Sequence, residues 1–196
     1  NAPIVSSSNP PTKAETRAAD TYHYEKVTTA PTDWSGTYIL VCDEMEYAWT
    51  GLDAASCFTE VDISNDNISD KNGAVELEIA SMTGGYSIKV IGGTNDGKYI
   101  SGKTKSGAPD NGIIFGTTAV ACSIDLKSKT VEESEITYSE ITSDTGTVMA
   151  YNKMSGNDRF RFFKASTASG YPTVQLYKKV EDQKAVESIE IVGTPS

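Results

Sequence analysis

The stretch of residues 75–90, VELEIASMTGGYSIKV, decides the fold class because its apolar side chains recur at every second position. Val75, Leu77 and Ile79 alternate with two glutamates, and the alternation resumes over residues 86–90 after the glycine pair at 84–85. A period of two is that of a strand with one buried and one solvated face, which is typical of antiparallel sheets. These residues therefore predict two half-solvated antiparallel strands.

The same pattern continues on both sides of this stretch. Further short apolar strands are expected at 37–41, 98–100, 113–115, 121–126, 147–151, 160–162 and 174–177. Turn signals rich in Gly, Asn, Asp and Ser separate them, such as Asn72-Gly73 and Ser106-Gly107. No long amphipathic helix is indicated. Many short strands at this spacing predict an all-β sandwich or a closed barrel.

A faint internal repeat favours the barrel. Short apolar strands leading into turns occur at residues 46–49, 98–101 and 147–150, about fifty residues apart. Three such units suit a β-trefoil, in which each unit supplies four strands. We therefore expect a closed, β-trefoil-like barrel, with a two-sheet β-sandwich as the alternative.

Charge excludes several classes of partner. The 196 residues contain 17 Lys and Arg against 27 Asp and Glu, which gives a formal net charge of −10. Nucleic-acid binding needs a basic surface, as does electrostatic binding to an anionic membrane, so we expect neither. No apolar run approaches the roughly 20 residues that a spanning helix requires, so we expect no direct membrane insertion.

The two ends of the chain differ in composition from the middle. Residues 1–21 hold Pro3, Pro10, Pro11 and a serine run with few bulky apolar side chains, and they predict a flexible N-terminal linker. Residues 22–180 are expected to form the all-β domain. Residues 181–196 are interpreted as a C-terminal linker or the start of a following domain, with a tail strand of the same sheet as the alternative.

Residues with chemical reactivity give weak signals. His23 is the single histidine and is expected to be an ordinary first-strand side chain, which disfavours triads and multi-histidine zinc sites. Cys42, Cys57 and Cys122 contain no CxxC spacing, and we favour reduced, buried thiols over a Cys42–Cys57 bridge. Residues 62–70 resemble a calcium loop but lack the EF-hand Gly and Glu, so a polar hairpin turn is the better interpretation. No metal, cofactor or catalytic residue is predicted.

Aromatic and arginine side chains are the predicted ligand-binding residues. Aromatic residues near turns can stack on sugars or anchor a partner, although many would fill the core. Two tryptophans next to Gly-containing turns are the best candidates for exposure. In the strand of residues 159–164, Phe160 and Phe162 are expected inward and both arginines outward. The predicted residues are Trp34, Tyr47, Trp49, Tyr99, Tyr151, Arg159 and Arg161.

Several of these strands resemble a known kind of module. The strands concerned are Tyr24-Glu25-Lys26-Val27-Thr28, residues 34–41, Gly97–Ile100, Arg159–Lys164 and Val174–Lys179. They are similar to an accessory all-β module of secreted and cell-surface multidomain proteins of gut Bacteroidetes and Firmicutes. Residues 186–192 resemble the opening strand of a bacterial Ig-like domain. The resemblance implies an extracellular or cell-surface location, flanking domains in the same polypeptide, and a binding or adhesive role. It implies no catalytic residues.

The sequence thus predicts a non-catalytic extracellular binding or adhesion module of a bacterial surface protein, with a glycan or another host or surface ligand as its partner. The first alternative is a structural spacer that binds no ligand. The second is a small hydrolase acting through carboxylates, because acidic residues are plentiful at 43–46 and 132–135.

Overall fold

The computed structural model describes residues 2–3 and 21–182 of the chain. Residues 23–180 form one compact unit, the first of two into which the chain divides. The predicted linkers at 1–21 and 181–196 therefore lie mostly outside the described residues. In the first unit nearly all regular structure is antiparallel strand, which confirms the all-β prediction.

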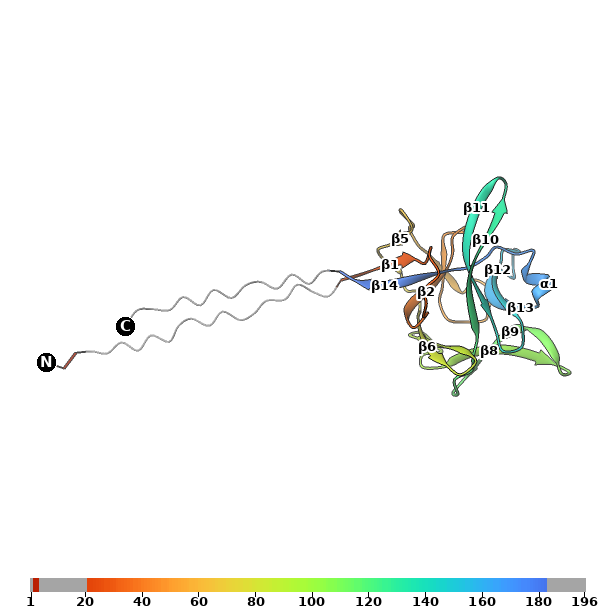
Figure 1. The fold of residues 1–196 in the computed structure, drawn as a ribbon, viewed down its shortest axis with the longest axis horizontal. Coiled ribbons are helices and arrows are strands. Elements are labelled where there is room, and N and C mark those ends of the chain that lie inside the picture. The colour runs from red at the N-terminus through yellow and green to blue at the C-terminus, as the bar shows by residue number, and fades with distance from the viewer. Residues whose placement is uncertain (1, 4–20, 183–196) are drawn as a thin grey trace. The chain divides into compact units, whose positions relative to one another are not determined.

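The strands belong to two sheets (Figure 1). The larger sheet contains β1 (Tyr22–Lys26), β2 (Gly36–Cys42), β3 (Tyr47–Trp49), β4 (Phe58–Glu60), β5 (Asn67–Ile68), β6 (Glu76–Met82), β7 (Gly85–Ile91), β8 (Tyr99–Lys105), β9 (Ala108–Gly116) and β14 (Gln175–Glu181). The smaller sheet contains β10 (Ser123–Val131), β11 (Ser134–Thr142), β12 (Val148–Asn152) and β13 (Arg159–Phe163). One short helix, α1 (Ala165–Ala168), follows β13.

The stretch that opened the sequence argument forms the β6–β7 hairpin. Leu77 pairs with Val90, and Ile79 with Ile88. All four side chains are buried, and the alternating Glu78 is exposed. Burying apolar side chains on one face is the main favourable term in folding. Period-two patterning therefore placed this hairpin correctly, with one face in the core.

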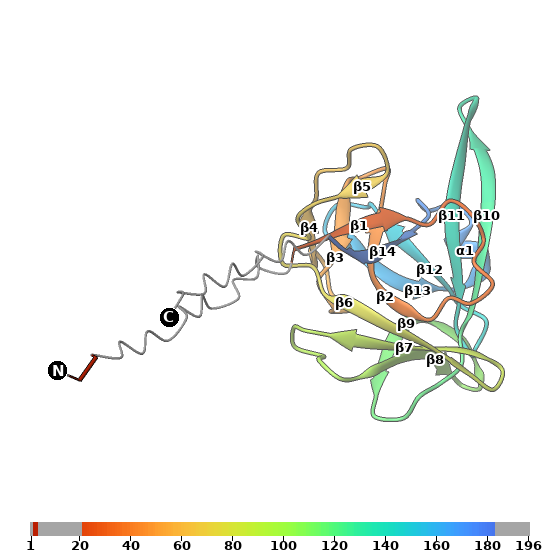
Figure 2. The same ribbon diagram turned by 60° about the vertical axis from the view of Figure 1, so that its left-hand side comes forward.

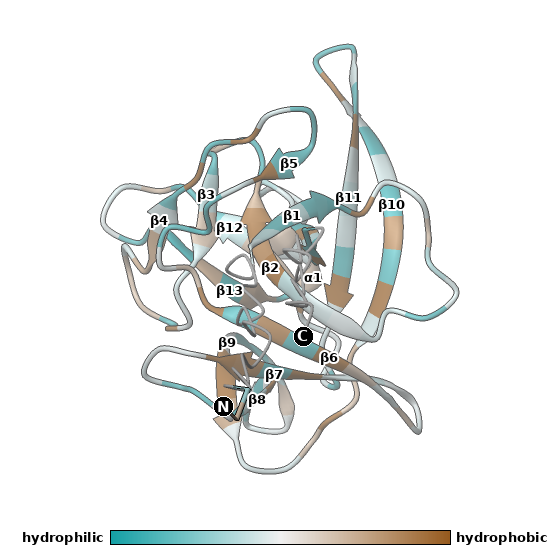
Figure 3. Cartoon of the chain, turned by 90° about the vertical axis from the view of Figure 1, so that its left-hand side faces the viewer, coloured by the Kyte–Doolittle hydropathy of each residue, from teal (hydrophilic) through white to brown (hydrophobic). Residues whose placement is uncertain are grey.

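The core lies between the two sheets. Its main cluster draws side chains from β2, β6, β7, β12 and β13, including Leu40, Ile88, Phe160 and Phe162. Both phenylalanines of β13 have no exposed surface, so their predicted inward orientation is confirmed. In Figure 3, β1 is mostly hydrophilic in colour, whereas β2 carries hydrophobic colour. Strand β2 is the central element, since five consecutive residues from Tyr38 to Cys42 are buried.

The two sheets are joined at a few backbone bonds. Tyr86 and Cys122 exchange both hydrogen bonds between β7 and the start of β10, at 2.9 and 2.8 Å. Ser139 N donates to Val174 O, next to β14, at 2.9 Å. Neither sheet, as far as the residues are described, closes on itself through continuous pairing.

The β10–β11 hairpin was only half predicted. Its second strand was not expected from the sequence, because the turn at Glu132 and Glu133 contains no Gly, Asn or Asp. Both glutamates have positive φ angles of 49° and 66°, the geometry of a tight two-residue hairpin turn. The far end of this hairpin projects beyond the other strands (Figure 2).

Residues 62–70 form the polar turn that was predicted. Ser64 bridges to Asn67, and the two residues between them, Asn65 and Asp66, have φ angles of 50° and 60°. Short polar side chains tolerate this left-handed conformation well.

The cysteines are not bonded to one another. Cys42 and Cys122 are buried, and Cys57 is half-buried. Burial raises the pKa of the Cys42 and Cys122 thiols to about 12, because the charged thiolate would lose its hydration.

Gly85 should be indispensable to the bond between the sheets. A Cβ at this position would collide with the carbonyl oxygen of Cys122, and its φ of 149° is already unfavourable for other residues. We expect Gly85→Ala to lower the free energy of unfolding by roughly 2–4 kcal/mol in urea titrations. Gly107→Ala, at φ 77° with open space around it, is the control and should cost about 1 kcal/mol. Equal losses would contradict this role.

The buried thiols should make stability fall at high pH. In the unfolded chain a thiol ionises near its ordinary pKa of 9.0, whereas in the fold the pKa of Cys42 and Cys122 is about 12. The unfolded state therefore loses protons first, and the free energy of unfolding falls between pH 9 and 12, by up to about 1.4 kcal/mol per pH unit for each thiol. The Cys42→Ala/Cys122→Ala variant should show a shallower slope in urea titrations across this range. An unchanged slope would show that the two buried thiols do not cause the loss of stability at high pH.

Candidate functional site

Both predicted tryptophans are buried, so the expectation that they are exposed is wrong. Trp49 has no exposed surface; its indole N–H donates to Leu52 O at 2.9 Å and its ring stacks on Phe115. Trp34 is 4% exposed and packs against Tyr38. A place beside a turn does not set the direction of a side chain, and both indoles belong to the main core cluster. Their position near glycines therefore did not predict exposure.

The three predicted tyrosines also differ in exposure. Tyr151 is buried and packs edge-on against Tyr47 and Phe58. Tyr47 is half-buried and stacks on Phe58 with ring centroids 4.0 Å apart. Tyr99 lies elsewhere, half-buried in β8 with Lys89 Nζ 5.3 Å from its ring centre. The predicted aromatic residues thus do not form one surface.

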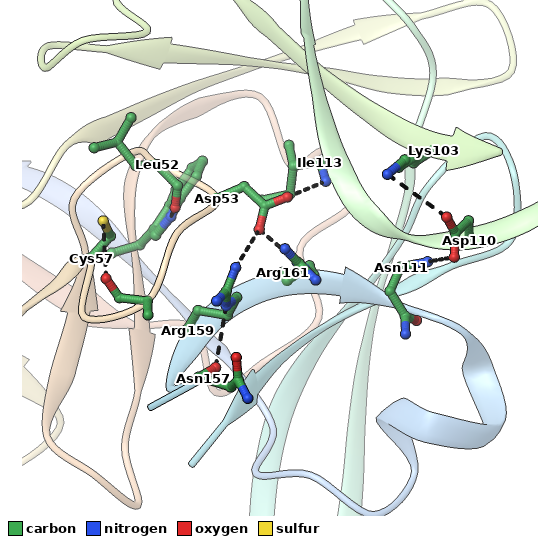
Figure 4. Close-up of polar contacts among 12 residues, drawn as sticks. Leu52, Asp53, Cys57, Lys103, Asp110, Asn111, Ile113, Asn157, Arg159 and Arg161 are labelled. Atoms are coloured by element: carbon green, nitrogen blue, oxygen red, sulfur yellow. Dashed lines mark hydrogen bonds and ion pairs between the residues drawn. The ribbon is translucent and has the colours of Figure 1, made fainter. Parts of the chain in front are cut away.

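The two predicted arginines are held by a carboxylate that sequence reasoning missed (Figure 4). Asp53 Oδ1 accepts from Arg161 Nε at 2.6 Å and lies 3.9 Å from an Nη atom of Arg159. Its other oxygen, Oδ2, accepts from the backbone N–H of Ile113 at 3.0 Å. The arginines are half-buried rather than fully outward. Their main contacts are structural, and they join β13 to the loop after β3.

Asp53 connects three hairpins. It follows β3, Ile113 lies in β9, and Arg161 lies in β13, so the β3–β4, β8–β9 and β12–β13 hairpins all meet this one side chain. The Asp53 side chain is 16% exposed. A partly buried carboxylate with charged and backbone donors gains far more than an exposed ion pair does. This network fixes the relative positions of the hairpins.

A cavity lies elsewhere, between the β10–β11 hairpin and the segment that leads into β14. Its volume is about 420 Å³, within the range of small-ligand sites. Val131 and Ile136 of the hairpin, with Tyr171 and Pro172 of the segment, form its apolar walls. None of the seven predicted binding residues lines it.

A hydrogen-bond network centred on Asp43 forms the polar part of this cavity. Asp43 Oδ1 accepts from the Tyr177 hydroxyl at 2.7 Å, and Oδ2 pairs with Lys26 Nζ at 2.8 Å. The Asp43 backbone N–H donates to Gln175 Oε1 at 2.8 Å, and Gln175 Nε2 donates to Thr173 Oγ1 at 3.3 Å. Burial, together with the negative charge of Asp43, raises the pKa of Tyr177, which keeps its hydroxyl a donor. These bonds hold the polar lining rigid.

Tyr171 provides the aromatic wall. It is half-buried and packs edge-on against Phe163, with ring centroids 4.9 Å apart. Its backbone N–H donates to Ala168 O at 3.0 Å, and the next residue, Pro172, accepts from Tyr151 N at 3.1 Å. The ring is therefore fixed at both its side chain and its backbone. The wall opposite Tyr171 belongs to the β10–β11 hairpin, whose second strand was not predicted.

A second, polar cavity surrounds the turn of residues 62–70. It has a volume of about 640 Å³ and is lined by Glu60, Asp62 and Asp70 among other polar residues. Across the described residues, no group of three or more His, Cys, Asp or Glu side chains is arranged to hold a metal ion. Within the same residues no helix is long and apolar enough to cross a membrane.

Comparison with known proteins gave no match to a family model, a curated protein or a solved structure.

Removing the Asp53 carboxylate should destabilise the fold. Asp53→Ala would leave the Arg161 guanidinium and the Ile113 N–H without their partner, and we expect a loss of about 2–4 kcal/mol in the free energy of unfolding. Asp110→Ala is the control, because the 3.8 Å ion pair of Asp110 with Lys103 and its 2.9 Å hydrogen bond from the Asn111 backbone N–H both lie within the β8–β9 hairpin. That variant should lose less than about 1 kcal/mol in the same urea titration. Similar losses for both would show that Asp53 has no special role.

Proposed function

We propose that the domain is a non-catalytic binding module that takes a glycan in the cavity beside Tyr171. The observation that carries this proposal is the combination of a fixed aromatic ring with rigid hydrogen-bonding groups in one 420 Å³ cavity. A sugar has an apolar face that stacks on aromatic rings and hydroxyl groups that need donors and acceptors. The hydroxyl groups of Thr173 and Ser169 lie beside the ring in the cavity lining.

The arrangement of the carboxylates supports binding rather than hydrolysis. Both oxygens of Asp43 are engaged, one by Tyr177 and the other by Lys26. Glu44 and Glu135 are more open to solvent at the cavity rim. A general acid for glycoside cleavage needs a carboxyl group in an apolar setting. We therefore rank the hydrolase alternative below the binding module.

The path of the chain disfavours the spacer alternative. Asp182 N donates to Thr21 O at 2.9 Å, so the chain enters and leaves the described part at neighbouring points. A module whose ends adjoin adds little distance between the segments before and after it. Such a module is better suited to present a binding surface to one side.

The extracellular or cell-surface location is proposed as well. It is supported by the resemblance of the 24–28, 34–41, 159–164 and 174–179 strands to accessory modules of bacterial surface proteins. The flanking domains of the same polypeptide would then be its immediate partners. The resemblance to an Ig-like opening strand at 186–192 lies outside the described residues.

We also propose that the domain is a β-trefoil-like closed barrel. The β3–β4, β8–β9 and β12–β13 hairpins begin about fifty residues apart, at the positions of the sequence repeat. The strands between them follow the succession β2–β6–β7–β10–β11–β14 and back to β2. Each neighbouring pair in this succession shares backbone hydrogen bonds. Between β7 and β10 these are the bonds of the Tyr86–Cys122 pair, and between β11 and the start of β14 it is the bond from Ser139 N to Val174 O.

Tyr171 should be essential for glycan binding. We expect Tyr171→Ala to weaken binding at least tenfold, because the ring supplies the stacking face. Tyr171→Phe should retain most of the affinity, since it keeps the ring and its packing on Phe163. The measurement is titration calorimetry with the best ligand from a glycan array.

Tyr99→Ala is the matched control, because Tyr99 is also a half-buried tyrosine but does not line the cavity. Thermal melting of each variant separates loss of binding from loss of fold. If no glycan on the array binds at millimolar concentration, the binding proposal fails. If Tyr99→Ala abolishes binding and Tyr171→Ala does not, the site has been placed on the wrong face.

A further inference from the structure

Two cavities meet at one lysine. The cavity beside Tyr171 and a neighbouring cavity of about 440 Å³ share Lys129, Ser169 and Thr173 as lining residues. Small apolar side chains, including Ala150, Ala165 and Ala168, line the second cavity. Together the two cavities form a groove along the β10–β11 hairpin, with Lys129 at the junction.

The strand pairing explains why this groove exists. Strand β11 pairs with β12 only at Thr142 and Val148. Beyond that point the backbone of Ser139 bonds to Val174, and the backbone of Tyr151 bonds to Pro172. The segment before β14 therefore runs between β11 and β12 and separates them. The hairpin stands away from β12, and the groove lies in the space that results.

Lys129 differs from the other described lysines. Its Nζ lies 5.9 Å from the centre of the Tyr138 ring, and no carboxylate in residues 21–182 lies within 4 Å of it. The nearby Glu140 is already paired with Lys127 at 2.8 Å. Among the other described lysines without a carboxylate partner, Lys71 is half-buried, but its Nζ donates to Ala74 O at 2.8 Å. The rest are exposed: Lys98, Lys105, Lys164 and Lys178.

A half-buried ammonium group without a counter-ion is only partly compensated. It has lost some of its hydration, and a ring face replaces only part of that loss. An anionic group in the groove would complete its contacts through a charge-assisted hydrogen bond. Because the groove opens on both sides of Lys129, such a group can belong to a ligand that extends in both directions.

We propose that this groove selects an acidic oligosaccharide, with the carboxylate or sulfate group of one sugar on Lys129 Nζ. This inference rests on the proposed function and adds the class of glycan. The ligand carries few charges rather than many, because the net charge of −10 and the rim residues Glu44 and Glu135 repel a polyanion.

The test compares matched pairs of sugars that differ in one acidic group. The probes are the α-1,4-linked trisaccharides of galacturonate and galactose, sialyllactose and lactose, and a mono-sulfated disaccharide with its unsulfated parent. We expect at least one acidic member to bind about tenfold or more tightly than its neutral partner in titration calorimetry. The sulfate and carboxylate arms distinguish the two sources of negative charge. Heparin should bind no more tightly than the preferred short probe.

Variants at position 129 connect any preference to this residue. Lys129→Met keeps an unbranched side chain of similar size but removes the ammonium group and its charge, and it should reduce the preference for the acidic probe to less than about threefold. Lys129→Arg should retain the preference. Lys105→Met, which removes an equal charge from an exposed site, is the control and should leave binding unchanged.

The outcomes separate this inference from the proposed function. If neutral probes bind as tightly as acidic ones and Tyr171→Ala abolishes that binding, the glycan site stands and the selection of acidic sugars is wrong. If Lys105→Met reduces binding as much as Lys129→Met does, the effect is one of net charge and the inference is wrong. If no probe of either kind binds, both proposals fail.

Discussion

The ion pair between Asp53 and Arg161 is the constraint on which the arrangement of this domain depends. A carboxylate from the loop after β3 meets an arginine of β13 and a backbone N–H of β9, so three hairpins that are distant in sequence are fixed by one side chain. Apolar burial can hold sheets together without specifying how they are oriented. A directional, partly buried bond of this kind specifies it. The core supplies most of the stability, and Asp53 fixes how the three hairpins lie relative to one another.

Where alternation was regular, sequence reasoning predicted the structure well. Residues 75–90 form the β6–β7 hairpin, and Phe160 and Phe162 point inward as expected. Both results follow from the period of a strand, which is a local property. The second strand of the β10–β11 hairpin was missed because its turn uses Glu132 and Glu133 in a conformation that glycine and asparagine usually adopt. Tertiary context, rather than a local signal, sets that turn.

The candidate site was harder to predict than the fold. Residue type and a position beside turns suggested that Trp34 and Trp49 would contact a ligand, but the same size that suits a ring for stacking also suits it for filling a core. The cavity that the structure contains depends on how Tyr171, near the end of the domain, lies opposite the unpredicted hairpin. Contacts between segments that are distant in sequence carry no local pattern. The arginines were identified as polar contacts, but their partner Asp53 could be found only from the fold.

The neighbouring ends of the described chain have a mechanical consequence. Hydrogen bonds join Thr21 to Asp182 at one end of the β1–β14 pair and Val27 to Leu176 at the other, so the two strands run antiparallel from the point where the chain enters. Tension applied through both ends would load these bonds one at a time, as in opening a zipper, instead of shearing them all together. A domain attached in this way yields at low force along its own chain. In a chain under tension, the β1–β14 pair would therefore open before the interior of the domain unfolds.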